Sequence, residues 1–283
     1  MHTRRFMTRP LLPLLLLWLC LQIVMSGAAG AADRDRIRAF LNVTGFDVAL
    51  DSIALSAGSA PAMLGLDAED FGESWERVTA EVFDTSTMRA LALDILEETL
   101  TDDLLNHAAA FYASDLGQRL VEAENASHMI EDDAGKQEQG KRIIADLVAE
   151  GSPRAQMLQR MNGAIDSSGT SVRALQEIQF RFLLAASAAG VVDLKMDPDE
   201  LRAMFKSQER EMRRLIQMSS MASAAYTYRD FSDADVQAYT EALEEPEMKR
   251  VYELLNAVQY EVMANRFEVL AARMAELHPG QDI

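Results

Sequence analysis

The stretch Thr101-Asp102-Asp103-Leu104-Leu105 runs on to Phe111-Tyr112-Ala113-Ser114-Asp115-Leu116-Gly117. A second stretch lies 131 residues later: Ser232-Asp233-Ala234-Asp235-Val236 runs on to Ala242-Leu243-Glu244-Glu245-Pro246-Glu247-Met248, and no gap is needed to align the two. Both indicate a capped short helix, a break and a second capped helix, because Ser, Thr and acidic residues favour helix starts. The match fits either an internal duplication or a chance likeness between two helical sequences.

The rest of the sequence has helical periodicity, with no convincing alternating strand pattern. This predicts an all-α fold, a multi-helix bundle. Glu150-Gly151-Ser152-Pro153 combines a helix stop, a cap and a helix-opening proline. We therefore expect two related helical halves, residues 33–150 and 153–278, packed together through their apolar faces.

Several helix limits follow from capping residues. Ser86 or Thr87 is predicted to cap one helix, and Thr101 and Ser114 the next two. Asp197-Pro198 is predicted to open a long helix that ends near residue 226. Pro246 is predicted to open the last helix, which ends near residue 277.

Residues 1–31 have the pattern of a signal peptide. A start with three arginines precedes an apolar run over residues 11–24, and Ala29-Gly30-Ala31 offers a cleavage site. We expect cleavage after Ala31 or a residue or two away, with an uncleaved anchor as the alternative. The apolar run is short for a membrane span. The expected location is the periplasm, with no stable membrane span after cleavage.

Composition excludes several classes of function. Cys20, the only cysteine, lies in the leader, so the mature chain has no thiol for disulfides, redox chemistry or metal binding. The leader holds three arginines and no acidic residue, so its removal changes the net charge from −18 to −21. Nucleic acid is excluded as a partner, because its binding depends on Lys and Arg replacing counterions.

Phe111-Tyr112-Ala113-Ser114-Asp115-Leu116-Gly117-Gln118 resembles the Phe-Tyr-x-Ser-x-x-Gly signature of domain-of-unknown-function family 2059, exported helical proteins of Gram-negative bacteria. The specific likeness covers about residues 100–125. It implies an all-helical fold and a periplasmic address. It implies no enzyme activity and hence no catalytic residue. The second copy departs from the signature, with Leu243, Glu245 and Met248 in place of the Tyr, Ser and Gly.

The signature has a structural interpretation that needs no ligand. Phe111 and Tyr112 can end one helix and staple it onto the next. Ser114 can accept hydrogen bonds from the free amides of the following turn. Gly117 permits another helix to approach closely.

Glu124, His128 and Glu131 are the weak metal candidates of the sequence. Their spacing of i, i+4 and i+7 places them on one face of a continuous helix, where a zinc-like ion could bind. The alternative, which we favour, is a solvated acidic face with one exposed histidine. No cofactor is expected, because Gly135–Arg142 lacks the Ser or Thr and the preceding strand of a phosphate-binding loop.

Methionines at positions 204, 212, 218 and 221 suggest an adaptable apolar core or groove. The leading hypothesis is a non-enzymatic periplasmic binding or interaction module with an apolar groove between helices. Its partner would be a protein, a peptide or a lipid-like ligand, and a homodimer would explain the same apolar residues. The alternative is a metal-binding protein or hydrolase-like enzyme that uses Glu124, His128 and Glu131.

Overall fold

A computed structural model describes residues 33–277. The chain forms α2 (Arg34–Thr44), α3 (Phe46–Asp51), η1 (Ser52–Ser59), α4 (Ala60–Met63), η2 (Ala68–Phe71), α5 (Ser74–Val82), α6 (Thr85–Thr99), α7 (Asp102–Tyr112), α8 (Asp115–His128), α9 (Asp133–Ala149), α10 (Arg154–Ile165), α11 (Ser171–Ala188), α12 (Pro198–Thr227), α13 (Asp233–Glu244) and α14 (Pro246–Leu277). No strand occurs within residues 33–277, so the predicted all-α fold is confirmed.

Side-chain caps fix most helix starts. The hydroxyls of Thr101, Ser114 and Ser232 accept backbone N–H groups at the starts of α7, α8 and α13, as predicted. The prediction that Ser86 or Thr87 caps α6 is wrong. Asp84 is the cap, and its carboxylate accepts a hydrogen bond from the Thr87 amide at 2.8 Å. The same carboxylate also accepts hydrogen bonds from the hydroxyls of Ser86 and Thr87.

The helix-break-helix frame recurs at the predicted distance. α7 and α13 begin at Asp102 and Asp233, and α8 and α14 begin at Asp115 and Pro246. The second helices differ in length, since α8 has 14 residues and α14 has 32. Duplication of the two halves stays a prediction.

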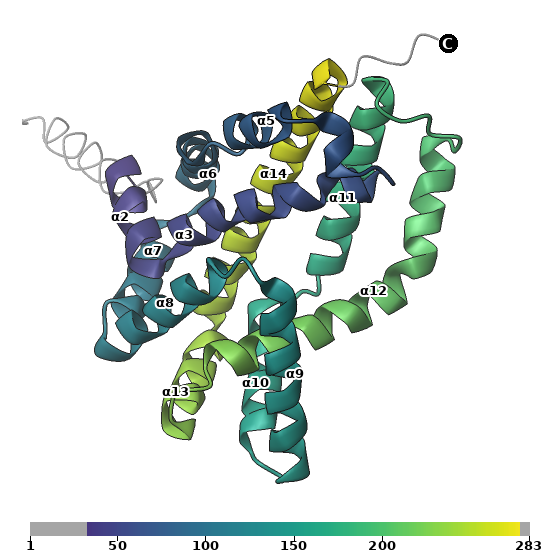
Figure 1. Cartoon of the computed structure of the whole chain (residues 1–283). Coiled ribbons are helices and arrows are strands. Elements are labelled where there is room, and N and C mark those ends of the chain that lie inside the picture. Colours follow the sequence, from purple (N-terminus) through teal and green to yellow (C-terminus); the bar gives the residue numbers. More distant parts are fainter. Residues whose placement is uncertain (1–32, 278–283) are drawn as a thin grey trace, which may run out of the picture.

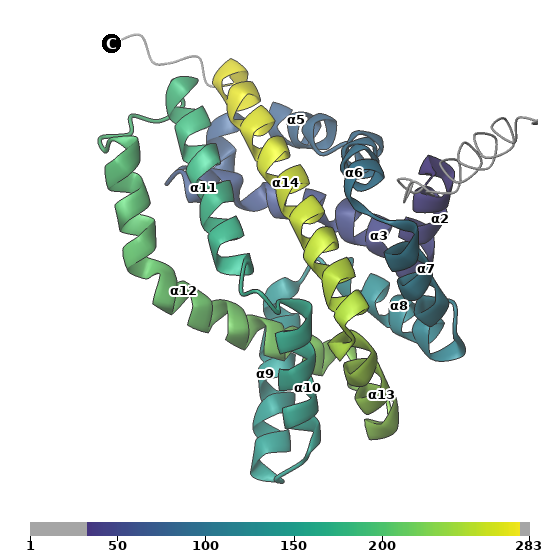
Figure 2. The ribbon, with the colours of Figure 1, turned by 180° about the vertical axis from the view of Figure 1, so that it is seen from behind.

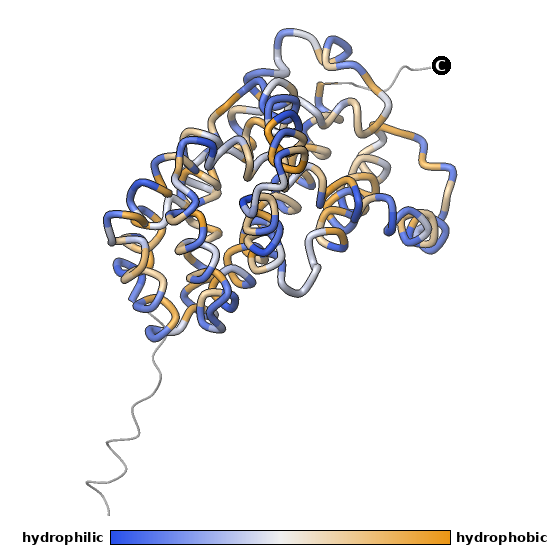
Figure 3. Tube along the Cα trace, turned by 90° about the horizontal axis from the view of Figure 1, so that it is seen from below, coloured by the Kyte–Doolittle hydropathy of each residue, from blue (hydrophilic) through white to orange (hydrophobic). Residues whose placement is uncertain are grey.

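The long helix α14 organises the core. It runs obliquely through the molecule and packs against α5, α6 and α7 as well as α10, α11 and α13 (Figures 1 and 2). The main apolar cluster extends from Ile37 to Met274 and includes residues from both sequence halves. Apolar and polar residues alternate along the helices, as amphipathic packing requires (Figure 3). The described residues of both halves thus share one core.

The α9–α12 contact is close enough to require a glycine. A Cβ atom on Gly140 would lie 2.0 Å from the carbonyl oxygen of Ala222 and 2.9 Å from its Cα. Both are backbone atoms, so no side-chain rotation could relieve the clash. Gly140 lies inside Gly135–Arg142, which is part of α9 and forms no phosphate-binding loop.

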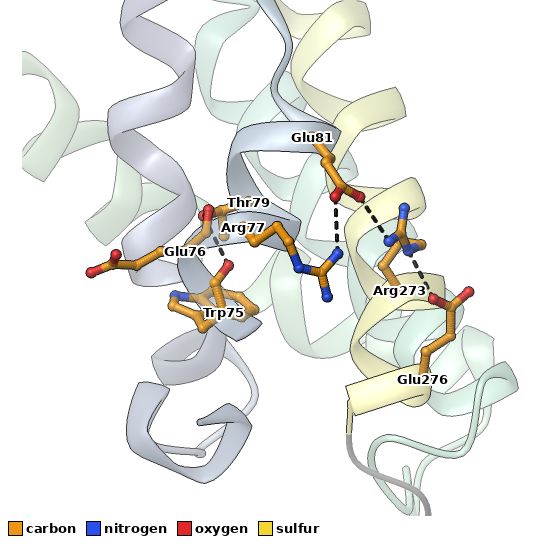
Figure 4. A network of polar contacts seen from close by, with 7 residues as sticks. All are labelled: Trp75, Glu76, Arg77, Thr79, Glu81, Arg273 and Glu276. Carbon is orange, nitrogen blue, oxygen red and sulfur yellow. Dashed lines mark hydrogen bonds and ion pairs between the residues drawn. The ribbon is translucent and has the colours of Figure 1, made fainter. Parts of the chain in front are cut away.

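The end of α14 is tied to α5 by ion pairs. Glu81 accepts Arg77 through Oε1 and Arg273 through Oε2, each at 2.9 Å (Figure 4). Arg273 also contacts Glu276 at 2.9 Å. The two guanidinium groups lower the pKa of Glu81. These groups are solvent-exposed, so the network fixes orientation more than it adds stability.

Residues 1–31, the predicted signal peptide, lie outside the described residues. Among residues 33–277, no single helix has both the length and the apolarity of a membrane span. One pair of helical segments is long and apolar enough when the two are taken together: Arg34–Thr44 and Phe46–Met63, which are bent by 81° relative to each other.

Candidate functional site

A cavity of about 390 Å³ lies where the two halves meet. Its walls come from α3, α7, α8, α9, α10, α12, α13 and α14. The apolar part of the wall includes Phe46, Met161 and Leu255, all buried. The polar part includes Glu124, His128, Lys136, Asn162 and four tyrosines, at positions 112, 228, 239 and 252. Its volume is within the range of small-molecule sites.

Glu124 is the centre of the polar wall. Tyr228 donates its hydroxyl proton to Glu124 Oε1 at 2.6 Å, and Tyr239 donates to the same oxygen at 2.8 Å. No hydrogen bond or ion pair reaches the other oxygen, Oε2, from any described residue. The carboxylate therefore has one oxygen held by the protein and one that remains open to a ligand.

The tyrosine hydroxyls form a connected cluster. Tyr239 Oη lies 2.9 Å from Tyr252 Oη and 3.2 Å from Tyr112 Oη, and Tyr112 also hydrogen-bonds to Tyr252. Tyr239 is fully buried, and Tyr112 and Tyr228 are buried with it. Burial raises the pKa of all four tyrosines well above the usual value, so each hydroxyl keeps its proton at neutral pH.

The same burial raises the pKa of Glu124, while the hydrogen bonds from Tyr228 and Tyr239 act in the opposite direction. Glu124 is only partly buried as a residue. Its interpretation as part of a solvated acidic face is nevertheless wrong, because two buried tyrosine hydroxyls contact its carboxylate.

This raised pKa predicts a pH-dependent stability difference. A carboxyl with a higher pKa in the folded state stabilises below its unfolded pKa, and this contribution is lost as pH rises through the folded pKa. Relative to wild type, Glu124→Gln should therefore gain stability as the pH rises from the ordinary pKa of a glutamate through the higher pKa of Glu124 in the folded state. The gain is about 1.4 kcal/mol for each tenfold difference in proton affinity between the folded and unfolded states. Urea unfolding at a series of pH values measures this difference.

The variant must be compared with wild type at each pH, because other carboxyl groups make the stability of the protein change with pH in the opposite direction. Arg119 and Ser232, for example, lower the pKa of Asp235 to about 2. Glu122→Gln, on the exposed side of the same helix, is the matched control for the same substitution at an exposed position. A constant difference between Glu124→Gln and wild type at all pH values would contradict the prediction.

The Phe111–Gly117 signature positions the cluster. Ser114 Oγ donates to the carbonyl oxygen of Phe111 at 2.6 Å and accepts the Gly117 amide at 3.1 Å. A Cβ on Gly117 would lie 2.3 Å from the Phe111 carbonyl oxygen and 2.6 Å from Tyr112 Cα. The absence of a side chain at Gly117 thus allows the end of the preceding helix, α7, to pack directly against it. The resulting tight turn places Tyr112 beside α8, the helix that carries Glu124.

The two aromatic residues of the signature reach beyond α8. Phe111 stacks on Tyr239 of α13, with ring centroids 5.7 Å apart and ring planes 9° apart. Tyr112 points its hydroxyl into the cluster. The signature therefore joins the two halves of the chain at the cavity.

The three metal candidates do not share a helix face. α8 ends at His128, so Glu131 lies beyond it and is exposed, while Glu124 and His128 both line the cavity. Within residues 33–277, no group of three or more His, Cys, Asp and Glu side chains could hold a metal ion. Burial and then the charge of Lys136 lower the pKa of His128, although solvent limits this effect because the residue is exposed.

A second cavity, of about 450 Å³, lies between α11 and α14. Its floor includes Ala174, Ile178 and Ala264. Its charged rim is already paired, since Arg181 binds Glu261 at 2.9 Å and also binds Glu268. It is the more apolar of the two cavities, but its ionic groups are already engaged with each other.

Residues 86–146 match the family described as "Uncharacterized protein conserved in bacteria (DUF2059)". This match covers 61 of the 283 residues. The predicted resemblance to this family is confirmed, over a longer segment than the predicted 100–125. No curated protein and no solved structure matches the chain. The DUF2059 segment supplies Tyr112 and Glu124, whereas the other three tyrosines of the cluster follow it.

Sequence reasoning missed Tyr228, Tyr239 and Tyr252. One available observation was the scarcity of tyrosine: the sequence has six, and four of them meet at this cavity. Polar hydroxyls at core positions of amphipathic helices require a buried partner. The sequence does not reveal that Glu124 is that partner.

Proposed function

We propose that this chain is an exported, non-enzymatic binding protein of the periplasm, and that its ligand occupies the Glu124 cavity. The observation that carries the proposal is the half-satisfied carboxylate, since Oε1 receives two hydroxyl protons and Oε2 receives none. Glu124 lines the cavity and is partly exposed, so this open carboxylate oxygen is accessible to a ligand group in a cavity of this size.

Export is supported by the basic, apolar and small-residue pattern of residues 1–31 and by the acidic composition of the remainder. The size of the cavity favours a small molecule over a protein or peptide partner. A lipid-like ligand would have to leave most of its chain outside a volume of about 390 Å³.

A binding role is favoured over catalysis by the groups around Glu124. The hydroxyls that contact it belong to buried tyrosines whose raised pKa values keep them protonated at neutral pH, so neither is a phenolate base. Lys136, another lining residue, is engaged by Asp133 at 2.9 Å and by the Ser127 carbonyl oxygen at 3.3 Å. Among the described residues that line the cavity, no Ser or Thr hydroxyl hydrogen-bonds to a His, Asp or Glu side chain.

The experiment is native mass spectrometry of protein exported with its own leader and purified gently without chelator. Ser220 lines the cavity on α12, and Ser207 lies exposed on the same helix. We expect an additional small-molecule mass on wild type and on Ser207→Phe, and its loss from Ser220→Phe, because the phenyl ring fills the cavity.

Retention of the mass by a folded Ser220→Phe variant would place the ligand elsewhere and contradict the proposal. An empty wild-type chain would also argue against it. One tightly held metal ion per chain would instead favour the alternative, a metal protein that uses Glu124 and His128.

A further inference from the structure

We infer that the ligand presents a protonated amine to Glu124 Oε2. This inference rests on the proposed binding function and names the chemical class of its ligand: a compact molecule with one ammonium group and an apolar body. The first argument is the state of the carboxylate. Its hydrogen bonds come only from neutral tyrosine hydroxyls, and no Lys, Arg or His among the described residues forms an ion pair with it.

A carboxylate that is partly withdrawn from water, as Glu124 is, gains free energy when a cation pairs with it. The Lys and His side chains of the cavity wall do not fill this role. Lys136 is held by Asp133 at 2.9 Å, and His128 forms no ion pair with Glu124. An ammonium group delivered by a ligand would supply the missing positive charge and donate hydrogen bonds to Oε2.

The cavity wall also fits the rest of such a molecule. Phe46, Met161 and Leu255 offer apolar surface for the body of the ligand.

The charge of the whole chain supports the same class. The net charge is −18 for the full sequence. A strongly acidic protein attracts cations and repels anions during approach, and a carboxylate in the cavity repels anions at contact. An anionic ligand would therefore be repelled both during its approach to the protein and at contact with Glu124.

The test uses two probes of the same shape, 2-phenylethylamine and its uncharged counterpart 2-phenylethanol, in isothermal titration at neutral pH. Wild type should bind the amine at least about tenfold more tightly than the alcohol. Glu124→Gln should weaken amine binding by about thirtyfold and leave alcohol binding nearly unchanged, because it removes the charge and keeps the shape. Glu122→Gln, exposed on the same helix, should behave like wild type.

The comparison of the two probes on wild type needs no variant, so it remains decisive if Glu124→Gln fails to fold. Equal affinity for amine and alcohol would overturn the ammonium inference while leaving the cavity as a binding site. Absence of amine binding at millimolar concentration would also overturn it. The proposed function would then be judged separately, by the mass retained on wild type and lost from Ser220→Phe.

Discussion

Gly140→Ala should lower the free energy of unfolding by about 3 kcal/mol, and Gly140→Val should prevent stable folding. The added Cβ would lie 2.0 Å from the backbone oxygen of Ala222, so α9 and α12 must separate. Overpacking of this kind costs about 1–3 kcal/mol or more, which exceeds the gain of up to about 1 kcal/mol from replacing a helical glycine. Urea unfolding followed by circular dichroism measures the change.

Gly163→Ala provides the matched control. Gly163 lies within α10, and nothing is within 4 Å of the position that its Cβ would take. The same added methyl group should therefore stabilise the protein by up to about 1 kcal/mol through helix propensity alone. Equal effects of the two substitutions would show that the α9–α12 contact is looser than described.

Tyr239→Phe should destabilise the fold by about 2 kcal/mol and reduce ligand retention. The substitution keeps the ring that stacks on Phe111 but removes the hydroxyl that donates to Glu124 Oε1 and meets Tyr112 and Tyr252. Buried groups left without partners cost about 1–3 kcal/mol. Chemical unfolding measures the stability, and native mass spectrometry measures the retained ligand.

Tyr226→Phe separates this effect from a general loss of a tyrosine hydroxyl. Tyr226 packs under Arg229, with the guanidinium carbon 4.1 Å from the ring centroid, and its hydroxyl makes no hydrogen bond to any described residue. Its replacement should change stability by less than about 0.5 kcal/mol. A Tyr239→Phe variant as stable as Tyr226→Phe would mean that the hydroxyl cluster contributes little.

The sequence predicts the helices well where their ends depend on local chemistry. Asp197 caps α12 through the amides of Asp199 and Glu200, and Pro246 opens α14, because caps and helix-opening prolines act within one turn. Asp84 shows the limit of such predictions. Its carboxylate competes successfully with the neighbouring Ser and Thr hydroxyls, which become its donors.

The site could be predicted only in part. Periodicity identifies the helix that carries Glu124, but not the helices that pack against it, and that packing decides whether the carboxylate is solvated or enclosed. His128 ends α8, so the expected i, i+7 relation to Glu131 fails for a local reason that a seven-residue spacing does not reveal. The donors from Tyr228 and Tyr239 depend on tertiary structure alone.

The hydroxyl cluster also bears on how the chain acquires its structure. The contacts of Glu124 with Tyr228 and Tyr239 join residues 104 and 115 positions apart, and those of Tyr112 with Tyr239 and Tyr252 span 127 and 140 positions. Such contacts require large loops to close before they add any stability, which raises contact order and slows folding. A growing chain would therefore hold an incomplete pocket until α13 and the start of α14 have been synthesised.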